Sequence, residues 1–190
     1  MSTYNFSYYN GPIRNVKPHK TMGLHEAIEL IKSNKYKADI DKLRTTENLS
    51  TKKTLKSFLP YFTFSGVFTK RLTENLKSHS GLIVLDFDDL DAERISQLFT
   101  DFITIDFVCA CWISPSGNGL KVLIKINPEQ HAQSFIELDD FFAGNFNLEI
   151  DQSGKDVARA CFVSCDPNIF YNPESKIFEV QNPQKDNSVL

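Results

Sequence analysis

The hydrophobic pattern is most regular from Gly81 onward, where apolar runs alternate with amphipathic segments. The run from Leu82 to Phe87 is almost entirely apolar and predicts a buried strand. The segment from Asp91 to Phe102 has apolar residues at helical spacing behind an acidic start, which favours a helix. The same criteria predict strands at Asp106 to Ile113 and at Leu120 to Ile126. A helix is predicted from Asn127 to about Phe142, and a last strand at Asn147 to Ile150.

This order, β, α, β, β, α, β, predicts an α+β fold with a ferredoxin-like or RRM-like core over about residues 81–151. The first and third strands of such a sheet are antiparallel neighbours, so the end of one lies beside the start of the other. We therefore expect Asp86 and Asp88 to face Lys121 and the turn SPSGNG at residues 114–119.

The first 80 residues have weaker patterns. Their initial 20 residues predict an arm or an edge strand, and helices are predicted from Thr21 and over Ser50 to Leu59, joined by a polar connection. Tyr61 to Phe68 favours a strand or hairpin before a short helix. The expected organisation is an N-terminal basic α+β module (1–80), an RRM-like module (81–180) and a polar tail (181–190), with the modules packed as one compact domain.

Charge sharpens this division. The first 80 residues carry 14 lysines and arginines against 6 acidic residues, whereas the other 110 carry 7 against 18, within a total of -3. A basic half beside an acidic half predicts one face that meets phosphates and another suited to metal. A protein that coats nucleic acid in general would be basic throughout.

Hydropathy and cysteine usage predict the compartment. No apolar run approaches the roughly 20 residues that span a bilayer, and the polar N-terminus is unlike a secretory signal, so we expect a cytoplasmic protein with no membrane partner. Disulfides are then not expected. The pairs Cys109/Cys111 and Cys161/Cys165 leave zinc open, but their strand-like surroundings favour cysteine as a small buried hydrophobe.

Two carboxylates mark the end of the first core strand. Asp86 and Asp88 are two residues apart, so on a strand both side chains point to one face and Phe87 points to the other. Adjacent like charges there repel unless a cation or basic groups offset them. The pair predicts a divalent metal site, against the alternative of carboxylates solvated in a loop with Asp89 and Asp91.

The turn SPSGNG supplies hydroxyl groups and closely approachable backbone N–H groups. Its candidate nucleotide ligands are Ser114, Ser116, Gly117 and Gly119, with Lys121 on the following strand. A plain hairpin would need the glycines only for backbone geometry, and taken alone the two interpretations are even. The neighbouring aspartate pair favours phosphate binding.

Asp151, directly after the last predicted strand, could complete a metal site as a third carboxylate. In an ideal ferredoxin-like sheet the fourth strand ends away from Asp86, so this role requires a short or shifted strand. Arg159 could clamp a phosphate or pair with a neighbour such as Asp156.

Three motifs, taken together in their order, resemble the VirE N-terminal-type domain, which is related to archaeo-eukaryotic primase-polymerases. They lie at Ser80 to Leu90, Ser114 to Lys121 and Ile150 to Asn172. By this resemblance Asp86 and Asp88 match the metal-binding DxD of that superfamily, with Asp151 as its third carboxylate and Arg159 as the arginine near the nucleotide.

The resemblance implies a primase-polymerase-like nucleotidyl transferase of DNA replication that uses Mg²⁺ or Mn²⁺, nucleoside triphosphates and a single-stranded DNA or RNA template. Helicase or further primase modules are the implied partners, in mobile elements or phage-like replication systems. The basic first half would hold the template backbone through residues that include Lys52, Lys53, Lys56, Lys70 and Arg71.

One departure leaves an alternative open. Lys121 stands where these enzymes usually have a histidine that contacts the nucleotide phosphates, and lysine offers a point charge without imidazole geometry. A catalytically inactive module that binds nucleotide or single-stranded nucleic acid beside a replicative helicase therefore stays possible. A haloacid-dehalogenase-type phosphatase is disfavoured, because 80 residues precede the DxD and the element order is not βαβαβ.

Overall fold

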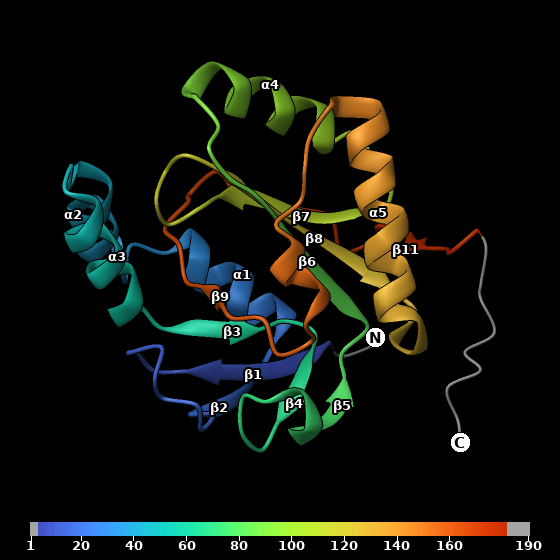
Figure 1. The fold of residues 1–190 in the computed structure, drawn as a ribbon, viewed down its shortest axis with the longest axis horizontal. Coiled ribbons are helices and arrows are strands. Elements are labelled where there is room, and N and C mark those ends of the chain that lie inside the picture. The colour runs from blue at the N-terminus through green and yellow to red at the C-terminus, as the bar shows by residue number, and fades with distance from the viewer. Residues whose placement is uncertain (1–3, 182–190) are drawn as a thin grey trace.

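The computed structural model describes residues 4–181 and has a mixed α+β fold (Figure 1). The first half comprises β1 (Asn5–Tyr9), β2 (Lys20–Gly23), α1 (Leu24–Lys32), α2 (Lys37–Thr45), α3 (Leu49–Phe58), β3 (Tyr61–Thr63), β4 (Gly66–Phe68), η1 (Thr73–Asn75) and β5 (Leu76–His79). The second half comprises β6 (Leu82–Phe87), α4 (Ala92–Phe102), β7 (Val108–Ile113), β8 (Leu120–Ile126), η2 (Pro128–Gln130), α5 (His131–Phe146), η3 (Gln152–Lys155), β9 (Cys161–Phe162), β10 (Phe170–Tyr171) and β11 (Ile177–Phe178).

Residues 4–181 contain three sheets, of which two organise the molecule and the third is the β4-β5 pair. In the larger one β8 is paired with β6 on one side and β7 on the other, and β10 and β11 extend it. β6 and β8 are antiparallel with Asp86 opposite Lys121, which confirms the predicted neighbours. The smaller sheet has the order β2-β1-β3-β9, so a strand from the second half of the sequence completes a sheet of the first half.

The strands of the larger sheet are apolar on both faces because each face covers a separate core. Ile83 and Leu85 of β6 face the core formed with α4 and α5, which includes Phe102 and Phe142. Leu82 and Val84 face the opposite core, formed with β1, β3 and α1. Since side chains alternate along a strand, Asp86 falls on the second of these faces, toward the smaller sheet.

The structure corrects the predictions for three segments. β1 is an interior strand between β2 and β3, with Phe6 and Tyr9 fully buried, and not an arm or edge strand. The polar connection between the first two predicted helices contains α2, which was missed because only Ile40 and Leu43 of its residues are buried. The short helix predicted before Gly81 is a single 3-10 turn followed by β5.

The fourth strand of the predicted core is also wrong, because residues 147–150 form no strand. Asn147 takes a left-handed conformation at the end of α5, which asparagine tolerates better than most residues, and this redirects the chain. The segment then reaches the end of β6, where the Asp151 N–H donates to the Asp86 carbonyl oxygen at 3.1 Å. Because residues 147–150 do not form the predicted strand, Asp151 lies at the end of β6 that carries Asp86.

Other predictions concern the cysteines, the tail and the membrane. All four cysteines are buried and unpaired, as expected for small buried hydrophobes. Of the predicted polar tail, only Gln181 belongs to the described residues. Within residues 4–181, no helix has the length and apolar character needed to cross a bilayer.

A pair of histidines, of which His131 is buried and His79 half-buried, joins β5 to the start of α5. The Gly81 N–H donates to His79 Nδ1 at 3.0 Å, so the neutral His79 ring carries its proton on Nε2 and donates it to His131 Nδ1, also at 3.0 Å. Burial lowers the pKa of both histidines, and the neighbouring His79 lowers that of His131 further, to about 4.

The histidine pair should make the fold less stable in mild acid. Because the folded-state pKa of His131 lies below its unfolded value of about 6.5, the unfolded chain takes up the proton first, and stability falls as the pH drops from about 6.5 toward 4. The expected loss is on the order of 3 kcal/mol, measurable by urea unfolding at pH 7 and pH 4.5. The variant His131→Gln, which cannot ionise, should show a smaller difference; an equal one would contradict the assignment.

Candidate functional site

A pocket of about 350 Å³ lies at the end of β6 and receives residues from both halves of the chain. It contains carboxylates and cationic side chains together, a combination that the sequence predicted only in part. Its lining residues are Ile13, Lys56, Arg71, Asp86, Asp88, Lys121, Ser153, Asp156, Ala158, Arg159, Ala160 and Phe162.

The floor of this pocket is an ion pair between Lys121 and Asp86. The two residues face each other across β8 and β6, and their side chains are only 6% and 12% exposed. Burial alone lowers the pKa of Lys121, but the adjacent Asp86 carboxylate outweighs it and raises that pKa to about 12. Lys121 is therefore a permanent positive charge beside the first aspartate.

Asp88 lies at the mouth of the pocket and is exposed. Within the described part of the chain, no hydrogen bond or ion pair engages its carboxylate. Partial burial and then repulsion from Asp86 raise its pKa, although Lys121 and Lys56 act in the opposite direction. Asp88 is thus the carboxylate of the pair that is open to a ligand.

Arg159 connects the third carboxylate to the first. Its guanidinium group pairs with Asp151 and lies 3.8 Å from the Asp86 carboxylate. Burial acts to raise the pKa of Asp151, but hydrogen bonds from Ser153 and the charge of Arg159 outweigh it and lower that pKa. Five predicted site residues, Asp86, Asp88, Lys121, Asp151 and Arg159, therefore lie together.

The turn residues Ser114, Ser116, Gly117 and Gly119 are not brought into this pocket, since none of them is among its lining residues. Gly117 has a φ of +81°, and a side chain at Gly119 would come within 2.4 Å of the Phe87 carbonyl oxygen, so both glycines are explained by backbone geometry. A hairpin is thus sufficient to explain the two glycines, and nucleotide binding by this turn stays a prediction.

Arg44 of α2 covers the same turn. It donates to the Ser114 carbonyl at 3.1 Å and to the Cys165 carbonyl at 3.4 Å, and its side chain lies against Gly117. These bonds fix α2, and α3 that follows it, beside the end of the larger sheet. No local sequence pattern indicated this role for Arg44, because its partners are 70 and 121 residues away.

Lys56 and Arg71 also line the pocket, whereas the sequence predicted them only as contacts of the template backbone. Arg71 lies over the Tyr61 ring at 5.2 Å from its centroid and donates to the Ile13 carbonyl at 3.4 Å, while its buried Nε has no hydrogen-bond partner among the described residues. Lys56 lies 5.9 Å from the centroid of Phe162. They form a cationic wall from the first half of the chain.

The pocket has an acidic side that fits a divalent cation shared with a phosphate ligand. Among residues 4–181, no three histidine, cysteine or acidic side chains are grouped so as to hold a metal by themselves. Mg²⁺, however, is commonly bound by one or two carboxylates and by substrate phosphates, not by a full protein cage. The unengaged Asp88 carboxylate, whose pKa is raised by partial burial and then by Asp86, is the observation that favours such a cation.

Comparison with known proteins gives a match to a family model. Residues 53–171 match the family described as BT4734-like, N-terminal domain. No curated protein and no solved structure matches the chain. The matched segment extends from α3 through β10 and includes every residue of the site discussed above except Ile13 and Arg44. Because this segment covers more than half of the sequence, the chain belongs to the family of BT4734-like N-terminal domains.

Proposed function

We propose that the pocket binds a nucleoside triphosphate with Mg²⁺ or Mn²⁺, and that the protein is a primase-polymerase-like nucleotidyl transferase of DNA replication. The observation that carries the proposal is the pairing of Asp86 and Asp88 with four cationic side chains around one pocket: Lys56, Arg71, Lys121 and Arg159. Carboxylates that can share a cation, facing cations that can hold phosphate, are what phosphoryl transfer requires. The resemblance to the VirE N-terminal-type domain supports the same function.

Each residue of the site would have a role that depends on its position in the pocket. Asp88 and the outer oxygen of Asp86 would hold the cation, with Asp151 as a third ligand when Arg159 turns to a phosphate. A bound cation would neutralise charge on the phosphate oxygens during transfer. Arg71 and Lys56 would orient the triphosphate from the opposite wall, because neither forms an ion pair with an acidic residue in the described structure. Lys121 would keep Asp86 ionised and in place.

A second candidate is a catalytically inactive module that binds nucleotide or single-stranded nucleic acid. The specific observation in its favour is the Lys121–Asp86 ion pair, which engages one oxygen of a carboxylate that catalysis would need for metal. In either case we propose a cytoplasmic protein that works on a nucleic-acid template with a helicase or a further primase module.

Incorporation of labelled nucleotides separates the two candidates. With a single-stranded template and either Mg²⁺ or Mn²⁺, the leading proposal predicts extension products on a denaturing gel, using deoxynucleotides and ribonucleotides in parallel reactions. Titration of the same chain with Mn²⁺ and nucleotide supplies the control for binding. Binding without incorporation supports the inactive module, and absence of both contradicts the proposed function.

A further inference from the structure

Helix α3 presents nearly all of its surface to the outside. None of its ten residues is buried, and Leu49 at its start is 81% exposed. Helices on a protein surface normally bury one apolar stripe, whereas Leu55 is the one apolar residue of this helix that is partly buried, against the small cluster that contains Leu59 and Cys165. The helix sequence LSTKKTLKSF has three lysines and no acidic residue.

The three lysines share one side of the helix. Leu49, Lys52, Lys53 and Lys56 follow the spacing i, i+3, i+4, i+7, which places them along a single face. No ion pair involves these lysines in residues 4–181, the part that the structure describes. Lys56, at the inner end, lines the pocket, and its charge opposes the rise in the pKa of Asp88 that burial and Asp86 cause.

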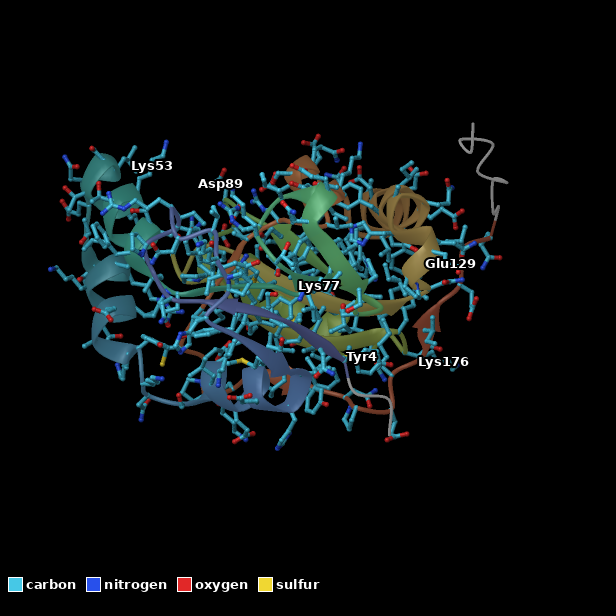
Figure 2. The ribbon with its side chains drawn as sticks, turned by 90° about the horizontal axis from the view of Figure 1, so that it is seen from below. Tyr4, Lys53, Lys77, Asp89, Glu129 and Lys176 are labelled. Carbon is cyan, nitrogen blue, oxygen red and sulfur yellow. The ribbon has the colours of Figure 1, made fainter. Side chains whose placement is uncertain are left out.

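The lysine face of α3 leads from the pocket toward the outside of the molecule. It begins at the pocket with Lys56 and leads outward over Lys52 and Lys53 to Leu49. Figure 2 shows Lys53 and Asp89, the residue after Asp88, on the same side of the molecule. On the preceding helix α2, by contrast, Lys37 pairs with Asp41 and Arg44 is engaged by backbone carbonyls.

We propose that Lys52, Lys53 and Lys56, the lysine track, bind the phosphate backbone of a single strand of nucleic acid and lead it into the pocket. Unpaired cations in a row along a helix match the regular charge of a nucleic-acid backbone. The half-buried Phe162 ring below Lys56 and the exposed Leu49 offer apolar contacts to unpaired bases, which a duplex does not present. The inference rests on the proposed function, in which this strand is the template.

The test measures strand binding alone, without metal or nucleotide. Fluorescence anisotropy of a labelled single-stranded DNA oligonucleotide should show roughly ten- to a hundred-fold weaker binding by the variant Lys52→Gln/Lys53→Gln/Lys56→Gln. The slope of log K against log salt should fall in magnitude by about 2, because three contacts to a single strand each contribute about 0.7. Since α3 buries no residue, the variant should keep the circular dichroism spectrum of the wild type.

Lys17, Lys32 and Lys77 provide a matched control, because all three are exposed and lie outside the pocket. Their triple change to glutamine removes the same charge and should weaken binding by less than about threefold. An equal loss in both variants would assign the effect to net charge and overturn the lysine track. Unchanged binding by the track variant, or tighter binding of a duplex than of the single strand, would overturn it as well.

The double variant Lys52→Gln/Lys53→Gln separates the track from the pocket, because it leaves Lys56 in place. It should bind the strand more weakly than the wild type but bind Mn²⁺ and nucleotide equally well. Track-dependent strand binding with no nucleotide binding would refute the proposed function and support the track. Nucleotide binding together with a strand affinity that does not depend on the lysine track would support the proposed function and refute the track.

Discussion

Replacing Asp88 by asparagine should reduce nucleotide incorporation by at least about a hundredfold while leaving the protein folded. The carboxylate is exposed and makes no hydrogen bond or ion pair in the described structure, so the fold does not depend on it. Its removal also relieves repulsion from Asp86. The free energy of unfolding should therefore stay the same or rise slightly, whereas cation and nucleotide binding should be lost together.

Asp89 supplies the control for this change. It is the next residue, it is exposed, and asparagine is compatible with its φ of 57°. Asp89→Asn removes the same charge within one residue and should retain full incorporation. Wild-type incorporation by Asp88→Asn would refute the catalytic proposal, and a loss shared by both variants would point to general charge near the pocket.

Replacing Lys121 by methionine should lower the free energy of unfolding by about 3–5 kcal/mol, because it leaves the Asp86 carboxylate buried without its partner. The double variant Lys121→Met/Asp86→Leu should recover most of that loss, since it removes both charges of the buried pair. Urea unfolding of the four proteins in the cycle measures the coupling. Additive losses would show that the two side chains do not stabilise each other.

The same pair predicts a dependence on alkaline pH. The pKa of Lys121 in the folded protein, about 12, is higher than its unfolded value, so the pair stabilises fully below about pH 10.5. Its contribution should be lost as the pH rises through about 12. In the double variant this part of the pH profile should be absent.

The core around Asp86 could be predicted from the sequence because the relevant signals are local. An unbroken apolar run predicts a strand, and the order of elements then fixes β6 beside β8, which puts Lys121 opposite Asp86. Asp151 was placed correctly at this end only on the condition that its strand was shifted, and the left-handed Asn147 supplies that condition.

The cationic wall could not be predicted in the same way. Lys56 and Arg71 belong to a part of the chain that carries many other basic residues, and their approach to the pocket depends on how the smaller sheet packs against β6 and β8. The glycines of the SPSGNG turn are ambiguous for the opposite reason: a phosphate loop and a tight hairpin use the same residues, and the approach of Gly119 to Phe87 accounts for that glycine by backbone geometry alone.

Strand β9 ties the walls of the pocket to each other. The chain leaves Arg159 on the acidic wall and, two residues later, pairs Cys161 and Phe162 with β3 of the opposite sheet. The two walls are therefore joined by backbone pairing, and we expect them not to separate as the two lobes of a hinged enzyme do. We expect a ligand to enter and leave this site through changes in the side chains of Lys56, Arg71 and Arg159, which line the pocket, and not through movement of the backbone.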